Sequence, residues 1–186
     1  MTSAHSRRKQ PERVRRALLD AAEKLAVDQG VAGVTIQAVA DAAGVTKGGL
    51  FHHFPSKQAL VEGMFADLLE SLDAQLEDAM SRDAEPRGRF TRAYVDSMFV
   101  IGDCGQDSPW AALLVSMMAE SELRRLWSDW LAARLHRHHE TDGDPMLEIV
   151  RLAADGAWLA VLTSNDSSAI MDAANVRDRL LLLTRG

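Results

Sequence analysis

Apolar residues recur at intervals of three and four along nearly the whole chain, and this pattern restricts the fold more than any other feature of the sequence. In the first such segment Val14, Leu18, Ala22 and Leu25 repeat at the spacing of one helix face. Glycine and proline interrupt the pattern at intervals, and loops are expected where they stand. The chain is therefore predicted to be all-α, with about nine helices.

Residues suited to cap a helix indicate where these helices begin and end. Thr35, Thr46 and Ser56 are suited to N-caps, while Gly30 and Gly44 permit the left-handed exit that ends a helix. A length of 186 residues suits one compact domain, or a small head fused to a larger body. We expect helices at about 11–29, 36–43, 46–52, 57–80, 88–101, from 109, and at about 120–139, 145–162 and 170–183.

Charge is unevenly distributed between the two ends of the chain. Residues 1–57 hold nine Lys or Arg against five Asp or Glu, whereas the remainder holds twelve against twenty-two. Binding depends on the local field rather than on the average, so the first segment could face phosphate although the chain as a whole is acidic. Charge alone leaves a second interpretation open, in which the basic arm is only solvated.

Composition is that of an ordinary globular protein, with 47% hydrophobic residues. No segment approaches the roughly 18 apolar residues that span a bilayer, and the basic N-terminus lacks the apolar region of a secretory signal. We therefore expect a cytoplasmic protein with no membrane partner. The single cysteine, Cys104, excludes an intrachain disulfide and fits a reducing compartment.

Two short predicted helices, joined by Ala43-Gly44-Val45, form a helix-turn-helix inside the positive segment. The second contains the stretch TKGGLFHHF, and its two glycines weaken it by about 1 kcal/mol each relative to alanine. Missing side chains at Gly48 and Gly49 would let the backbone approach DNA closely. The alternative is close packing of this helix against the first one, and both can hold together.

Residues 13–60 resemble the DNA-binding head of the TetR family of bacterial transcriptional regulators. The resemblance rests on the alanine-rich first helix, on the Ala43-Gly44-Val45 turn, and on the signature Leu50-Phe51-x-His53-Phe54-x-x-Lys57-x-x-Leu60. It implies phosphate contacts from Thr35, His53 and Lys57, and base-edge contacts from Gln37, Thr46, Lys47, Gly48 and His52. The family usually has Tyr at the position of Phe51, so a hydroxyl contact to phosphate is expected to be absent here.

The resemblance also implies a two-part organisation, with a DNA-binding head at 1–57 and a helical ligand-binding and dimerisation domain at 58–186. It implies a repressor that binds a palindromic operator in double-stranded DNA as a homodimer and is released by a small-molecule effector. A transcriptional activator with the same head is left open.

Aromatic residues and methionines concentrate in the second part and suggest where an effector would bind. The candidate set can equally be ordinary core, because Met and Trp fill both cores and pockets. The acidic body would favour a cationic or neutral amphiphile over an acyl-CoA. The candidate ligand-binding residues are Tyr94, Met98, Trp110, Met117 and Trp127.

A dimer interface is predicted on the last two helices. Residues 146–162 are apolar around most of the helix, and we expect Ile149, Leu152 and Leu159 to face the body's own core. The opposite interpretation buries both helices within one subunit. The predicted interface residues are Leu147, Val150, Ala154, Trp158 and Val161, with Val176 and Leu180 on the last helix.

Catalytic and metal-binding patterns are sparse. In LHRHHE, His136 and Glu140 stand four residues apart with His139 beside them, but no second ligand pair has a recognised spacing. The alternative of a small all-α enzyme would have to use Cys104 or the His136/His139 cluster, and no nucleophile with a base or phosphate loop assembles. We expect no catalysis, no cofactor and no metal.

Overall fold

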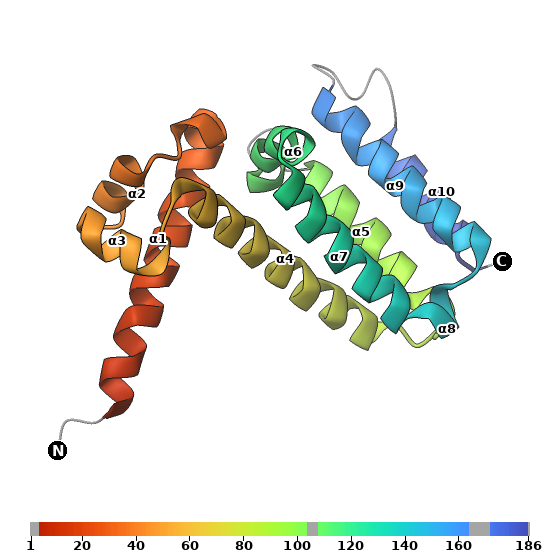
Figure 1. Ribbon diagram of the computed structural model, residues 1–186. Helices are drawn as coiled ribbons and strands as arrows, with labels where there is room; N and C mark the ends of the chain where they lie inside the picture. Colours follow the sequence, from red (N-terminus) through yellow and green to blue (C-terminus); the bar gives the residue numbers. More distant parts are fainter. Residues whose placement is uncertain (1–3, 104–107, 164–171, 186) are drawn as a thin grey trace. The chain divides into compact units, whose positions relative to one another are not determined.

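The protein is all-α, as the periodicity predicts. The structure, a computed structural model, describes residues 4–103, 108–163 and 172–185, and within these ranges every regular element is an α-helix (Figure 1). The helices are α1 (Ala4–Gly33), α2 (Ile36–Ala42), α3 (Lys47–His53), α4 (Lys57–Arg82), α5 (Arg89–Asp103), α6 (Pro109–Ala119), α7 (Ser121–Arg137), α8 (His139–Asp142), α9 (Pro145–Thr163) and α10 (Ala173–Leu183).

The first helix begins earlier than predicted. Pro11 was expected in the first turn, but α1 starts at Ala4 and Pro11 lies inside it. Proline lacks an N–H, so it removes one internal hydrogen bond from α1 without ending the helix. The predicted exit at Gly30 is confirmed, because its φ of 70° breaks the helical path before residues 31–33 make a last turn.

The first compact unit comprises residues 1–68 and 109–124, so it includes α6 and the start of α4 and α7 in addition to the predicted head. Here α2 and α3 contact α1, and α6 also packs against α1. An ion pair between Arg16 and Asp67, 2.6 Å apart, joins α1 to α4. The buried apolar residues of this unit include Leu18, Leu19, Ala22, Val39, Leu50, Phe54 and Phe65.

The second compact unit comprises residues 69–108 and 125–186. In it α5 packs against both α9 and α10, which also contact each other. Tyr94 and Met98 on α5 are almost fully buried, as is Leu147 on α9. The stripe of Tyr94, Met98 and Ile101 is therefore core, as its helical spacing indicates.

The short helix α8 was not predicted, and its function is structural. It carries Asp142, which is 2% exposed and accepts hydrogen bonds from the backbone N–H groups of Phe90 (3.3 Å) and Thr91 (2.8 Å). The Thr91 hydroxyl donates to the same carboxylate, and Arg151 on α9 donates to that hydroxyl oxygen at 2.6 Å. Asp142 thus accepts from the otherwise unpaired N–H groups at the start of α5. Its negative charge also interacts favourably with the positive end of the α5 helix dipole.

The prediction for the faces of α9 is wrong. Leu147, Val150 and Ala154 were expected to face outward but are fully buried, whereas Leu152 and Ile149 are 63% and 57% exposed. Trp158 and Val161 are half-buried, as is Val176 on α10, while Leu180 is buried. Periodicity could not choose a face on a helix that is apolar nearly all round. The buried Arg151 shows which face of α9 turns inward, because its hydrogen-bond partner Thr91 lies on α5.

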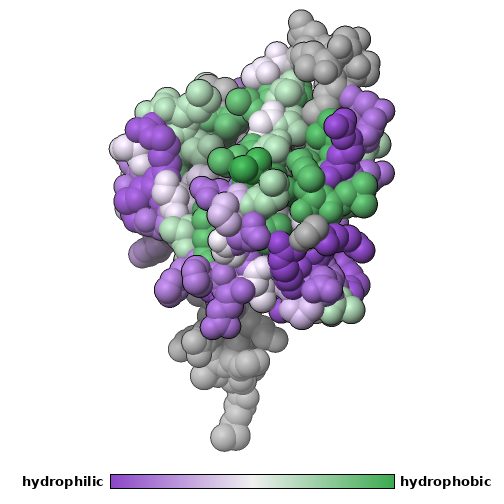
Figure 2. All heavy atoms as spheres, turned by 90° about the vertical axis from the view of Figure 1, so that its right-hand side faces the viewer, coloured by the Kyte–Doolittle hydropathy of each residue, from purple (hydrophilic) through white to green (hydrophobic). Residues whose placement is uncertain are grey.

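The exposed side of α9 and α10 is strongly apolar. Figure 2 shows green, hydrophobic side chains gathered over this side of the second unit and bordered by purple, hydrophilic ones. We call this surface the α9–α10 apolar face. Its large exposed members are Met146, Ile149, Leu152, Leu159, Leu182 and Leu183.

Among the described helices, none combines the length and the hydropathy that a membrane span requires.

Candidate functional site

The helix-turn-helix forms through the caps that the sequence predicts. Thr35 accepts from the N–H of Ala38 at 3.1 Å, and Thr46 accepts from the N–H of Gly49 at 3.0 Å. Between them Gly44 takes a φ of 67°. The N–H of Val45 then reaches the Ala40 carbonyl at 2.9 Å, the closing bond of a Schellman turn.

The side chains predicted to contact DNA surround α3 and the start of α2. Lys47 opens α3 on the surface, His52 is exposed in its last turn, and His53 is half-buried. The hydroxyl oxygens of Thr35 and Thr46 accept cap bonds, so each hydroxyl hydrogen remains available to a phosphate oxygen. This arrangement places donors of the kind that bind phosphates and base edges along one short helix and its start.

The two glycines of α3 are not required by packing within the chain. A Cβ at Gly48 would meet only the Thr46 Oγ1 at 3.9 Å, and one at Gly49 would meet the same atom at 3.4 Å. Gly63 on α4 is different, because a Cβ there would stand 2.6 Å from Cε1 of the Phe54 ring. The packing alternative for Gly48 and Gly49 therefore has no support in the fold, whereas Gly63 is a packing glycine that sequence reasoning missed.

Gln37 has an internal partner that was not predicted. Its Nε2 donates to Asp41 Oδ1 at 2.6 Å, one helical turn later on α2. This bond fixes the amide and leaves its Oε1 as the acceptor that can face outward. The spacing of four residues between an amide and a carboxylate was the signal that could have shown it.

Lys57 makes contacts that differ from the expected one. The family resemblance implied a contact with phosphate, but the ammonium donates to the carbonyls of Val31 (3.2 Å) and Ala32 (3.4 Å). The kink at Gly30 leaves these carbonyls beyond the regular part of α1, where a cation is favoured. Lys57 thus joins α1 to α4, and a contact with phosphate stays a prediction.

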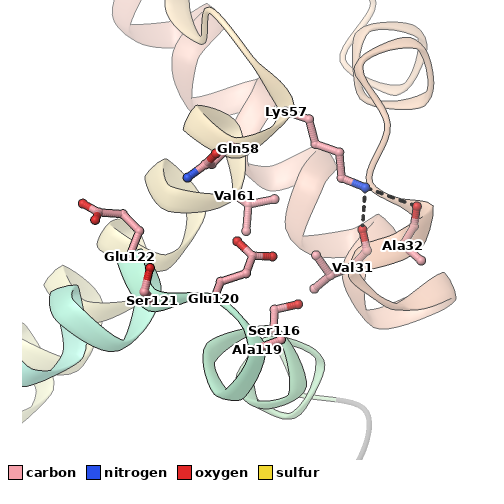
Figure 3. A pocket seen from close by; sticks show the side chains of 10 residues that line it. All are labelled: Val31, Ala32, Lys57, Gln58, Val61, Ser116, Ala119, Glu120, Ser121 and Glu122. Atoms are coloured by element: carbon pink, nitrogen blue, oxygen red, sulfur yellow. Dashed lines mark hydrogen bonds between the residues drawn. The ribbon is translucent and has the colours of Figure 1, made fainter.

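A cavity of about 710 Å³ lies beside this contact within the first unit. Figure 3 shows Lys57 reaching across to Val31 and Ala32 on one side, with Glu120 on the loop between α6 and α7. Residues from α1, α4, α6 and α7 thus line one cavity next to the helix-turn-helix. Its lining residues are Val31, Ala32, Lys57, Gln58, Val61, Ser116, Ala119, Glu120, Ser121 and Glu122.

The predicted effector residues are divided between the two units and line neither this cavity nor the smaller one described below. In the first unit, Trp110 meets the Phe65 ring edge-on at 5.9 Å. Met117 is half-buried on the same helix, α6. In the second unit, Trp127 lies against Trp130 at 5.3 Å.

Among the predicted effector residues, Tyr94 is unusual because it is paired with a carboxylate, that of the half-buried Asp155. The Tyr94 hydroxyl donates to Asp155 Oδ1 at 2.6 Å. Burial raises the pKa of Asp155, although the Tyr94 hydrogen bond and the Arg151 charge oppose the shift. Burial and the neighbouring Asp155 also raise the pKa of Tyr94. Tyr94 is fully buried and Asp155 is half-buried, so the pair brings a polar contact into the core of the second unit.

The His136–Glu140 motif does not form one helix face. His136 belongs to α7 and Glu140 to α8, because the chain breaks at His138. Among the described residues, no group of three or more His, Cys, Asp or Glu is placed to hold a metal ion. Cys104 lies outside the described residues.

Comparison with known families agrees with this geometry over most of the chain. Residues 18–64 match the profile described as bacterial regulatory proteins, tetR family. Residues 88–185, more than half of the chain, match the profile described as tetracyclin repressor-like, C-terminal domain.

Individual proteins show the same likeness. The transcriptional repressor KstR2 of Mycolicibacterium smegmatis is 32% identical over 92 residues, which cover 50% of this chain but only 45% of that protein. KstR2 of Rhodococcus jostii is 27% identical over 164 residues, covering 79% of this chain and 78% of the relative. Among solved structures, the multidrug binding protein EbrR complexed with malachite green has a TM-score of 0.70 at 19% identity, covering 91% of this chain and 97% of that one.

Proposed function

The chain belongs to the TetR family of bacterial transcriptional regulators, and we propose that it is a repressor that binds a palindromic operator as a homodimer and leaves it when a small molecule binds. The observation that carries the DNA-binding half of this proposal is the surface of α3. Lys47, Gly48 and His52 are exposed there, and nothing in the fold requires glycine at position 48.

In this proposal α3 enters the major groove. Lys47, Gly48 and His52 approach base edges together with Gln37 and Thr46, while Thr35, His53 and Lys57 contact the phosphates. Exposed Phe51 adds an apolar contact at the same surface. The head at 1–57 supplies these contacts, and the domain at 58–186 supplies the effector site and the dimer.

A selection of genomic fragments for bound DNA, followed by affinity measurements on the selected operator, tests this assignment. Lys47→Ala is expected to cost about 1–3 kcal/mol of binding free energy and to flatten the base preference, because a base-edge donor is lost. Lys24→Ala is the matched control, since Lys24 pairs with Asp28 on α1 at 2.8 Å. Unchanged affinity and base preference in Lys47→Ala would refute the assignment of α3 as the recognition helix.

The proposed response to an effector depends on two packed helices of the first compact unit, α6 and α1. Because α6 packs against α1, a displacement of α6 would be passed to the helix that carries α2 and α3. We propose that effector binding in the domain at 58–186 moves α6 in this way, with Tyr94, Met98, Trp110, Met117 and Trp127 as candidate contacts. Residues 58–186 are strongly acidic, which favours a cationic or neutral amphiphile. The malachite green complex of EbrR offers a first compound to try.

Repression rather than activation is proposed because both KstR2 relatives are named repressors. Transcription in vitro from a template with the selected operator separates the two. Added protein should lower the transcript yield, and an increase would favour an activator with the same head.

A further inference from the structure

The second unit contains a basic pocket that the proposed function does not use. It lies where the end of α4, the start of α5 and the end of α10 meet, with a volume of about 310 Å³. Four of its ten lining residues are arginines, although residues 58–186 carry an excess of acid. The arginines are Arg82, Arg89, Arg92 and Arg185, and the other lining residues are Ala79, Asp83, Ala84, Ala93, Asp96 and Leu181.

Arg92 is a fixed part of the pocket wall. It is 5% exposed, and its Nε donates to Asp83 Oδ2 at 2.6 Å. Its other nitrogens donate to the Arg87 and Glu85 carbonyls at 2.8 and 2.6 Å. The Arg92 hydrogen bond is the main cause that lowers the pKa of Asp83. Both charges of this pair are thus satisfied, and Arg92 holds the loop between α4 and α5 in place.

The remaining acids near the pocket are also paired. Arg82 bonds to Asp78 at 2.5 Å, and Asp96 Oδ1 forms an ion pair with Arg177 at 2.7 Å, although the geometry of that contact is not that of a hydrogen bond. The guanidinium groups of Arg89 and Arg185, by contrast, make no hydrogen bond or ion pair with any residue in the described part of the chain. Two positive charges therefore border the pocket without a hydrogen-bonded partner, although the Arg185 charge also contributes to the lowered pKa of Asp83.

We propose that this pocket binds a small dianion, such as inorganic phosphate or a short dicarboxylate, through the guanidinium groups of Arg89 and Arg185. A guanidinium presents paired N–H donors that match the oxygens of phosphate and carboxylate. Arg89 opens α5 and Arg185 follows α10, so the bound anion would connect the start of one helix to the end of the other. The anion would stabilise the folded state by mass action.

Titration calorimetry of the full chain with inorganic phosphate, and separately with malonate, at constant ionic strength tests the proposal. One anion should bind per chain. Arg185→Gln and Arg89→Gln should each weaken binding about tenfold, because a charge-assisted hydrogen bond is lost. Arg185→Lys should retain part of the affinity. The ratio of the phosphate and malonate affinities identifies which kind of anion the pocket prefers.

Arg179→Gln is the matched control, because Arg179 is exposed on α10 and does not line the pocket, so the variant removes the same charge elsewhere. Circular dichroism of each variant confirms that the helices are intact, and the lysine variant at the same position, Arg89→Lys or Arg185→Lys, replaces a glutamine variant that fails to fold. Binding that is absent for both anions, or that is equally strong in wild type and the Arg89 and Arg185 variants, would overturn the proposal. If Arg185→Gln had the mass of one subunit where the wild type has the mass of two, the proposal would also be overturned, and Arg185 would be assigned to a subunit contact. This test requires neither DNA nor effector, so its outcome is independent of the proposed repressor function.

Discussion

At the scale of single residues, a substitution at Gly48 distinguishes most clearly between an effect on stability and an effect on DNA binding. Gly48→Ala is expected to stabilise the protein by up to about 1 kcal/mol, because alanine is the better helix former and its Cβ meets no closer atom than Thr46 Oγ1 at 3.9 Å. The same Cβ should weaken operator binding if α3 approaches DNA closely. Urea unfolding and an operator titration measure the two effects.

Gly63→Ala is the contrasting variant. Its Cβ would overlap the Phe54 ring at 2.6 Å, so the free energy of unfolding should fall. If Gly48→Ala left operator affinity unchanged, the missing side chain at position 48 would have no part in DNA binding.

Asp155 provides a residue-scale prediction for pH. Its raised pKa means that the folded protein binds this proton more tightly than the unfolded chain, whose carboxyl has an ordinary pKa near 3.8. The stability that protonation confers is therefore fully present below about pH 4 and is lost as pH rises through the folded pKa. Asp155→Asn keeps an acceptor for Tyr94 but removes the charge.

The expected result is that stability of Asp155→Asn relative to wild type increases as pH rises from about 4 and then becomes constant. Urea unfolding of both proteins over a pH series measures this difference. A difference independent of pH would show that the carboxyl has the same pKa in both states.

At the scale of elements, α8 shows how four residues can position a longer helix. Asp142→Ala would leave the N–H groups of Phe90 and Thr91 buried without their acceptor. Each unsatisfied buried donor costs about 1–3 kcal/mol, so a loss of several kcal/mol in the free energy of unfolding is expected. Denaturant unfolding measures it.

Glu140→Ala is the control for this experiment, because Glu140 is exposed on the same helix. If both substitutions had the same small effect, Asp142 would not hold α5.

The elements also show which features the sequence could predict. Local chemistry at Thr35, Gly44 and Thr46 was sufficient to predict the helix-turn-helix, because caps and left-handed glycines act over a few residues. The buried face of α9 depends on Arg151 meeting Thr91, sixty residues away, and no local pattern contains that contact. The break at His138 likewise precedes a segment whose Asp142 is bonded to the distant start of α5.

At the scale of the whole molecule, the proposed operator requires two heads in a fixed relation, because one short recognition helix covers only a few base pairs. A twofold dimer would supply this relation. The α9–α10 apolar face is suited to be its interface, because large apolar side chains gathered on two adjacent exposed helices commonly mark an interaction surface. Leu152, 63% exposed, is therefore the position to test, whereas Ala154, predicted from the sequence to lie in the interface, is fully buried within the subunit.

Light scattering at micromolar concentration should give the mass of two subunits for the wild type and of one subunit for Leu152→Glu. Circular dichroism should show the variant still folded, while its operator affinity should fall because each half-site then binds alone. Ala154→Glu should instead destabilise the fold, since it places a charge in the subunit core. Glu148→Gln, an exposed change on the same helix, should leave the mass of two subunits intact. A wild-type protein with the mass of one subunit would rule out the dimer, and the apolar face would then have to be covered by a different partner.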